Sequence, residues 1–342
     1  MNKLSLSHHE IQSIESLLHD ISARYHSVDD PDFLLEVSFF AHELPRRLRR
    51  FLTEFKLLEP AGGVCLISGY PINQTKIGAT PNHWNDKSDV SRTIEEEMLF
   101  VLCASLLGEP FGWVTQQDGH IIHEVLPIKE YAHEQISVGS EQPIWWHNED
   151  AFHPFRGDYV GLMCLRNPDN VATTVAPIDA IDLEHSQFKV LFEPRFTILP
   201  DKSHQKEANT TEAPDQDHES VEVAFQKIAE MGIGREKVPI LIGTPESYYI
   251  RIDPYFMDSL DHDEEAQVAL DKLVNSIDAR LGQVVLHPGD ICFIDNYKAV
   301  HGRESFQAKY DGTDRWLKRI NVTRDLRKSR GSRSHPASRL IA

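Results

Sequence analysis

The change of pattern at Phe111 is the feature that most constrains the fold. From this residue onward the chain consists of short apolar runs separated by turn residues, most clearly at 159–165, 238–242 and 290–295. Apolar runs of this length, bounded by Gly, Pro, Asn and Asp, are typical of strands joined by short turns. The sequence therefore predicts an antiparallel β core in the second part of the chain.

The first hundred residues follow a helical pattern instead. Residues 7–24 begin with Ser7 and Glu10 in capping-box spacing and continue with apolar residues at helical intervals. Two more helices are predicted over 32–54 and 91–107. We therefore expect an α+β fold that is mainly β, with helices flanking the core.

The domain organisation follows from these patterns. A chain of 342 residues can bury one large core, so we expect a single domain, mainly helical over 1–110 and with its β core over 111–327. Residues 201–221 are rich in polar and charged side chains, which predicts a mobile insertion and a candidate lid. The basic residues 328–342 are expected to form a flexible tail.

Composition excludes several classes of partner. With 53 acidic and 35 basic side chains the net charge is −18, which repels nucleic acid and suits a cationic small molecule. No apolar stretch approaches the roughly 20 residues that span a bilayer, and the amino terminus lacks the apolar region of a secretory signal. The cytoplasm is the expected location. Four cysteines without CxxC spacing are expected to be reduced core residues.

A His-x-Glu pair marks the candidate metal site. In a strand, His147 and Glu149 project from the same face and can reach one cation. His301, which follows a predicted buried strand, is the candidate third ligand. Two histidines and one carboxylate on one side of a metal are associated with non-haem iron(II) oxygenases. The alternative of a zinc hydrolase lacks the usual His-Glu-x-x-His helix. The rival histidines, expected at the surface or in hydrogen bonds, are His120, His123, His133 and His153.

A series of short motifs separates the chosen histidines from their rivals. Between residues 116 and 327 the chain contains, in order, QIS at 135–137, HNEDAFH at 147–153, DYV at 158–160, CLR at 164–166, PGD at 288–290, HGR at 301–303 and YDGTDRWL at 310–317. With these motifs the chain resembles the clavaminate synthase-like branch of the taurine dioxygenase superfamily, and within it the hydroxylases of free arginine or lysine. The resemblance implies a double-stranded β-helix, or jelly roll, in which His147, Glu149 and His301 hold iron(II). It also implies 2-oxoglutarate and O₂ as cosubstrates, with release of succinate and CO₂.

The resemblance also implies the residues that bind 2-oxoglutarate. The distant carboxylate of this molecule needs a fixed cation, for which a planar guanidinium is well suited. Arg315 follows His301 at the interval that the family uses for this residue. Thr174 falls where the family has a supporting hydroxyl.

Four residues are candidates for binding an amino acid. By the resemblance, Arg319 engages the α-carboxylate of the substrate and Gln116 contacts its α-amino side. The far end of a cationic substrate needs an acidic partner, because an unpaired buried cation is costly. Asp253 and Glu130 are the candidates for that partner.

The substrate preference rests on one departure from the family. Relatives that hydroxylate arginine have two acidic residues two positions apart, whereas this chain has Asp253 and Tyr255. A single carboxylate suits a compact ammonium, so we expect L-lysine, hydroxylated at C3 or C4, with L-arginine as the alternative. Glu149 argues against a halogenase, which lacks the carboxylate ligand. A non-catalytic jelly-roll binding protein is the alternative of another class, and a homo-oligomer stays open.

Overall fold

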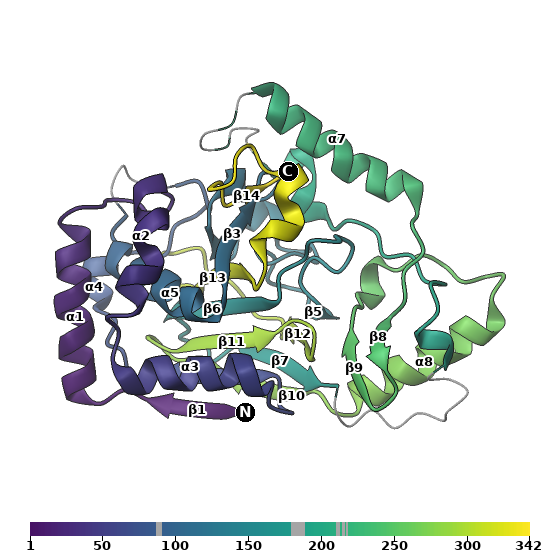
Figure 1. Ribbon diagram of the computed structural model, residues 1–342, viewed down its shortest axis with the longest axis horizontal. Coiled ribbons are helices and arrows are strands. Elements are labelled where there is room, and N and C mark those ends of the chain that lie inside the picture. Colours follow the sequence, from purple (N-terminus) through teal and green to yellow (C-terminus); the bar gives the residue numbers. More distant parts are fainter. Residues whose placement is uncertain (87–90, 179–188, 210–212, 214–215, 217) are drawn as a thin grey trace.

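The structure is a computed structural model, drawn in Figure 1, and it describes residues 1–86, 91–178, 189–209, 213, 216 and 218–342. Two sheets form its centre. Among the described residues the larger sheet has eight strands, which are β1 (Asn2–Ser5), β2 (Val64–Ser68), β11 (Ile291–Asp295), β6 (Tyr159–Arg166), β13 (Trp316–Thr323), β3 (Glu109–Trp113) and β14 (Leu340–Ile341) in spatial order, with β4 (Ile122–Val125) also paired to β13.

The smaller sheet carries the strands that matter most below. Within the described part of the chain it has the order β10 (Gly282–Val285), β7 (Ala172–Pro177), β12 (Ala299–Arg303) and β5 (Ile144–His147), and each neighbouring pair is antiparallel. A separate hairpin joins β8 (Leu241–Thr244) to β9 (Ser247–Ile250).

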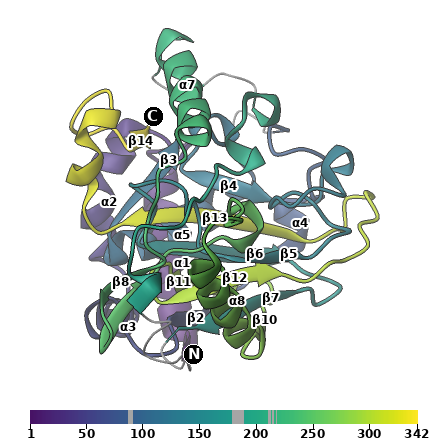
Figure 2. The same ribbon diagram turned by 90° about the vertical axis from the view of Figure 1, so that its right-hand side faces the viewer.

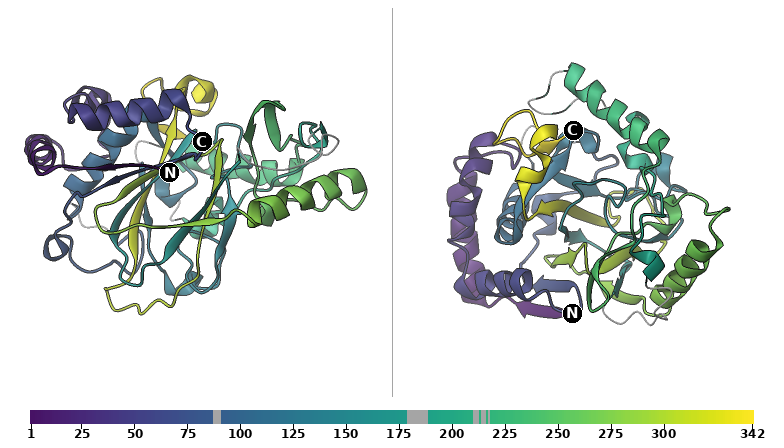
Figure 3. Two further views of the ribbon diagram at one scale, coloured as in Figure 1. Left: turned by 90° about the horizontal axis from the view of Figure 1, so that it is seen from below. Right: turned by 45° about the vertical axis from the view of Figure 1, so that its right-hand side comes forward.

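The helices cover the outer faces of the two sheets. They are α1 (His8–Ser22), α2 (Pro31–Ala41), α3 (Arg46–Leu58), α4 (Gln74–Ile77), α5 (Ile94–Leu107), α7 (His218–Gly234) and α8 (Glu264–Asp278). In both views of Figure 3 the purple and blue helices of the first hundred residues lie on one side of the strands, and the green helix α8 lies on the other. Figure 2 brings α8 and the β8–β9 hairpin to the front.

Alternation of side chains along the strands explains this layering. On β11, Cys292 and Ile294 point into an apolar cluster shared by strands of both sheets, whereas Phe293 points into the cluster formed with the helices. Successive side chains of a strand face opposite sides, so a strand buried on both faces needs an uninterrupted apolar run. The run at 290–295 therefore marks a central strand. All four cysteines are buried and free, as expected.

The predictions for the helical part are confirmed with one correction. Ser7 caps α1 in a complete capping box, as its spacing with Glu10 predicted. The single helix predicted over 32–54 is wrong, because two helices, α2 and α3, occupy this stretch. Pro45 lies between them and precedes the first residue of α3. Proline cannot continue the hydrogen bonding of a preceding helix, so the chain turns there.

Two segments expected to be flexible contain regular structure. In the polar insertion, Lys202–His204 and Lys206–Ala208 form short 3-10 turns, and α7 begins at His218, while the mobility of this segment stays a prediction. Residues 210–212, 214–215 and 217 of the same stretch lie outside the described residues. The tail is also docked, because β14 pairs with β3 and Ile341 is buried. None of the helices in the described ranges is long and apolar enough to cross a membrane.

The packing of α5 on the larger sheet leads to a stability prediction. Phe100 of α5 is fully buried, and its ring lies 5.8 Å from that of Phe293. Phe100→Ala should lower the free energy of unfolding by about 3–5 kcal/mol, because it leaves a cavity in the core. Urea unfolding followed by circular dichroism measures this change. Phe39→Ala, at a position 72% exposed, is the control and should change the same quantity by less than about 0.5 kcal/mol.

Candidate metal centre

The pairing of β5 with β12 brings the three predicted ligands together. His301 lies opposite His147 in the antiparallel register, and Glu149 follows two residues after the end of β5. The Nε2 atoms of His147 and His301 lie 3.6 and 3.4 Å from Oε2 of Glu149. Potential ligand atoms of the three side chains all lie within 4.8 Å of one another. This arrangement fits one cation bound from a single side, with other positions open to small ligands.

Neighbouring groups orient these ligands. Nδ1 of His147 lies 2.8 Å from the carbonyl oxygen of Trp145, so an N–H there donates to the carbonyl and leaves the Nε2 lone pair for a metal. Arg319 donates through Nη1 to Oε1 of Glu149, which leaves Oε2 facing the histidines. Among the described residues, the four rival histidines are not part of this cluster.

The charges at the cluster favour the binding of a cation. Burial raises the pKa of Glu149, but Arg319 and the two histidines outweigh burial and hold it well below its usual range. Burial lowers the pKa of His147, yet its hydrogen bond with Glu149 and the charges of Asp253 and Glu149 raise it to about 9. Burial also lowers the pKa of His301. Glu149 is therefore an anion, and a divalent cation can replace the His147 proton as its partner.

A cavity of about 90 Å³ opens beside the three ligands, well above the space that one buried water needs. Its wall combines carboxylates, arginines, hydroxyls and aromatic rings. The polar and aromatic residues in this wall include Trp145, His147, Glu149, Thr173, Asp201, Ser203, Asp253, Tyr255, His301, Arg303, Arg315 and Arg319.

One part of the wall carries two buried arginines. Arg315 is 5% exposed, its buried Nε has no hydrogen-bond partner, and within the described ranges it forms no ion pair. Burial lowers its pKa to about 10. Arg303 was not predicted as a site residue, but it is equally buried. It donates to the carbonyl oxygens of Gly139 and Gln142, and no carboxylate of the described residues pairs with it. Two buried cations without acidic partners favour a dicarboxylate ligand.

The threonine that faces the cavity is the neighbour of the predicted one. Thr173 pairs with Arg303 and Thr174 pairs with Gly302 in the register of β7 and β12. Residues that pair directly share a face, so Thr173 faces the cavity with Arg303 and His301, and it lines the cavity. Thr174 faces the other side, and the prediction is corrected by one residue. The sequence alone does not show which of the two threonines faces the cavity, because Thr173 and Thr174 are adjacent.

The residues predicted to bind an amino acid are brought together in part. Arg319 donates through Nη2 to Oε1 of Gln116 at 2.6 Å, which puts both beside Glu149. Asp253 lines the cavity. Glu130 does not, because it lies exposed in the surface turn Lys129–Tyr131, and its assignment to the site is wrong.

A second carboxylate reaches the cavity from an unexpected segment. Asp201 lines it together with Ser203, whose Oγ donates to Oδ1 of Asp201 at 2.5 Å. Burial is the main cause that raises the pKa of Asp253 to about 6, and the charge of Asp201 adds to it. The two carboxylates therefore line the same cavity. Asp201 belongs to no motif, and its only distinguishing feature in the sequence is its place in a polar stretch.

Buried hydrogen bonds anchor the segment that carries Asp201. His204 is fully buried, with Nε2 3.0 Å from Oδ1 of Asp150 and Nδ1 2.9 Å from Oγ1 of Thr115. The Nε1–H of Trp113 donates to the other oxygen of Asp150 at 2.6 Å. Asp150, Asp201 and His204 could also be read as a metal site, but Asp150 and His204 are already paired with each other and with these protein groups.

Comparison with known proteins agrees with this geometry. Residues 100–321 match the model of the taurine catabolism dioxygenase TauD, TfdA family. The chain is 43% identical to an L-ornithine/L-arginine 3-hydroxylase of Catenulispora acidiphila and 43% identical to an enduracididine beta-hydroxylase of Streptomyces hygroscopicus, in both cases over 100% of each chain. An L-lysine 3-hydroxylase of C. acidiphila is 29% identical over 89% of this chain and 79% of its own length.

Solved structures of a non-heme iron oxygenase are similar to this chain over almost its whole length. The non-heme iron oxygenase OrfP in complex with Fe, succinate and (3S)-hydroxy-L-Arg superposes with a TM-score of 0.94, at 43% identity and over 100% of both chains. The same oxygenase with Fe and alpha-ketoglutaric acid gives a TM-score of 0.88, at 41% identity, over 99% of this chain and 100% of the other.

The ligand geometry predicts the effect of removing the carboxylate. Glu149→Ala should weaken iron(II) binding by at least about tenfold, because one of three protein ligands is lost. Anaerobic titration with iron(II) measures the dissociation constant. Glu130→Ala removes an exposed carboxylate outside the cavity and should bind iron(II) like the wild type. Equal affinities for Glu149→Ala and the wild type would remove Glu149 from the site.

Proposed function

Because the chain belongs to the TauD/TfdA family and is a 2-oxoglutarate-dependent dioxygenase that uses iron(II) and O₂, we propose that it hydroxylates free L-arginine at C3. When bound, iron(II) with 2-oxoglutarate and O₂ supplies the oxidising power that turns a C–H bond into C–OH, with succinate and CO₂ as coproducts. In this proposal His147, Glu149 and His301 hold the iron. Two carboxylates in one cavity, Asp201 and Asp253, are the observation that carries the choice of substrate.

The cosubstrate end of the cavity is assigned to the two buried arginines. 2-Oxoglutarate has a carboxylate at each end, and Arg315 offers the guanidinium that its distant carboxylate needs. Arg303 adds a second positive charge nearby. Burial and, after it, the charge of Arg315 lower the pKa of Arg303 to about 9. Thr173 supplies a hydroxyl from the same face.

The opposite charge is assigned to the amino acid substrate. A guanidinium is a planar fork of donors, and it is best satisfied by two carboxylates or by one bidentate carboxylate. Asp253 offers one carboxylate and Asp201 offers the second from a segment some fifty residues earlier in the chain. Arg319 and Gln116 remain the proposed partners of the α-carboxylate and the α-amino group.

The preference for lysine over arginine is therefore reversed. It rested on finding one carboxylate in the segment of Asp253, where Tyr255 replaces a second one. It overlooked Asp201, because residues distant in sequence can line the same cavity. The relatives support the same revision, since the arginine-type hydroxylase is 43% identical and the lysine 3-hydroxylase is 29% identical. L-Lysine becomes the runner-up.

A second substrate has one observation in its favour. The enduracididine beta-hydroxylase is as similar to this chain as the arginine-type enzyme, and its substrate, by its name, is enduracididine. Enduracididine therefore belongs in the same substrate test.

We also propose that the core is a double-stranded β-helix within one domain, because the eight-stranded and four-stranded sheets of the described residues share an apolar cluster between them. The cavity opens beside the smaller sheet, at the end of β5 and on β12.

The cosubstrate assignment predicts a selective effect of Arg315→Leu. The concentration of 2-oxoglutarate for half-maximal turnover should rise by about ten- to a hundredfold, because a buried charge-assisted pair is lost. The concentration of arginine required should change by less than about threefold. Steady-state assays of succinate formation measure both values, with Arg327→Leu, at an exposed position, as the control. Equal increases for both molecules would give Arg315 another role.

The substrate assignment is tested by competition. L-Arginine, L-ornithine, L-lysine, enduracididine and L-norleucine are offered together, and singly oxygenated products are identified by mass spectrometry. We expect arginine to be preferred. Asp201→Asn and Asp253→Asn should each lower kcat/KM for arginine by about a hundredfold or more, the effect of a buried charge that loses its partner. Asp261→Asn, at an exposed position, is the control. Preferential oxygenation of norleucine would contradict the acidic subsite, and preference for lysine would restore the runner-up.

A further inference from the structure

Two asparagines next to the metal ligands form hydrogen bonds with every polar atom of their side chains. Asn148, between His147 and Glu149, and Asn296, in the turn between β11 and β12, are both fully buried. Every side-chain nitrogen and oxygen of the two amides takes part in a hydrogen bond to the backbone. Neither side chain lines the cavity. Any effect of these side chains on the cavity must therefore pass through the backbone groups to which they are hydrogen-bonded.

Asn296 holds the backbone of Glu149. The Glu149 N–H donates to Oδ1 of Asn296 at 2.7 Å, and Nδ2 of Asn296 donates to the Glu149 carbonyl oxygen at 2.9 Å. Nδ2 also donates to the carbonyl oxygen of Gly157 at 2.9 Å. Because β5 ends at His147, none of the strands in the described ranges continues this pairing, and the amide forms the hydrogen bonds that a neighbouring strand would form.

Asn148 joins three segments at one point. Its Nδ2 donates to the carbonyl oxygens of Asn296 at 2.8 Å and Ala299 at 3.0 Å, just ahead of His301. On the other side, its Oδ1 accepts from the Ile252 N–H at 2.9 Å, and its own N–H donates to the Ile252 carbonyl oxygen at 2.8 Å. Ile252 immediately precedes Asp253. One side chain therefore links the strand of His147, the strand of His301 and the segment of the proposed substrate carboxylate.

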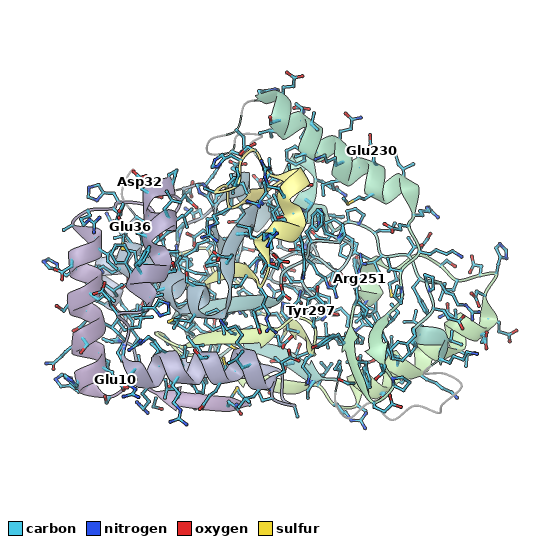
Figure 4. The ribbon with its side chains drawn as sticks, viewed as in Figure 1. Glu10, Asp32, Glu36, Glu230, Arg251 and Tyr297 are labelled. Carbon is cyan, nitrogen blue, oxygen red and sulfur yellow. The ribbon has the colours of Figure 1, made fainter. Side chains whose placement is uncertain are left out.

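Arg251 adds a parallel tie between the same segments. Its Nε donates to the carbonyl oxygen of Ala151 at 2.6 Å and its Nη2 to that of Phe152 at 2.7 Å. Figure 4 labels this side chain among those at the centre of the molecule, near Tyr297. The residues that follow Glu149 are thus also connected to the residues that precede Asp253.

We propose that Asn148 and Asn296 are positioning residues that couple iron binding to the placement of the substrate. Asn296 sets the backbone of Glu149, and hence the direction of its carboxylate. Asn148 holds Asp253 at a set distance from the ligands, so the target carbon lies over the metal. Errors of about 1 Å in such an arrangement are enough to lower rates by about a hundredfold. This inference rests on the proposed function for the identity of the substrate but not for the effect on iron.

The chemistry of the amide explains why asparagine is required. Each side chain offers one acceptor to an N–H and two donors to carbonyl oxygens. Aspartate has nearly the same shape but turns the donor end into a second acceptor, which would face two carbonyl oxygens. Asn148→Asp and Asn296→Asp therefore test the hydrogen bonds with little change in volume.

Asn167 offers a matched control. It is also buried, accepts from the Val171 N–H at 3.0 Å, and donates to the carbonyl oxygens of Val171 and Leu286. It does not line the cavity. Asn167→Asp breaks the same kinds of hydrogen bond away from the ligands, so it reports the purely structural cost.

The experiment compares the three aspartate variants in three measurements. These are thermal unfolding without metal, anaerobic titration with iron(II), and the ratio of amino acid hydroxylated to 2-oxoglutarate consumed. Asn296→Asp should weaken iron(II) binding by about ten- to a hundredfold, the range known for groups that orient metal ligands. Asn148→Asp should lower the hydroxylation ratio at least about threefold, because the substrate is displaced from the metal while 2-oxoglutarate is still consumed. Asn167→Asp should lower thermal stability without changing the other two values.

The outcomes separate this inference from the proposed function. If Asn148→Asp and Asn296→Asp changed iron affinity and hydroxylation ratio no more than Asn167→Asp does, the positioning role would be wrong. Should an aspartate variant fail to fold, Arg251→Met breaks the parallel tie alone and should also lower the hydroxylation ratio; an unchanged ratio would overturn the coupling. A wild-type protein that binds iron(II) and oxidises another amino acid would contradict the choice of arginine, and the same three measurements would then be made with that amino acid.

Discussion

The antiparallel pairing of β5 with β12 is the constraint on which the rest of the site depends. It places His147 opposite His301. The strand β5 ends at His147, and the carboxylate of Glu149 then lies close to both histidines. Backbone hydrogen bonds of a sheet are directional and repeat at a constant spacing, so they place side chains more accurately than a loop does. The pairing of β7 with β12 extends the same frame and selects Thr173 instead of Thr174.

Charge divides the cavity into regions. Arg303 and Arg315 are buried without acidic partners among the described residues, whereas the carboxylates Asp201 and Asp253 line the same cavity. Each group would be unfavourable if it stayed unpaired, because burial removes the hydration that stabilises a charge. The cavity therefore contains charges that ligands of the opposite sign can neutralise. Glu149 and Arg319 also line the cavity and are paired with each other.

The polar stretch over 201–221 shows how composition and context can disagree. Its composition indicates a segment that cannot bury enough apolar surface to order itself. In the structure, residues 201–209 are nevertheless tied down by His204, which is fully buried against Asp150 and Thr115. A few buried hydrogen bonds to the core compensate for the missing apolar contacts, and they bring Asp201 to the cavity. The lid role expected for residues 201–221 stays a prediction.

The sequence by itself determined the family, the class of enzyme and the combination of helices with large β-sheets, because these depend on local periodicity and on motifs of adjacent residues. It also predicts the metal ligands as a set and Arg315 as the cationic residue for 2-oxoglutarate. It does not determine strand register, which turns Thr173 and not Thr174 toward the cavity, and it does not show that Asp201 lines the cavity or that Glu130 is exposed. Those choices depend on which distant segments meet. Contacts between residues fifty or more positions apart are set by the packing of the two sheets and their loops, and only the tertiary structure decided them.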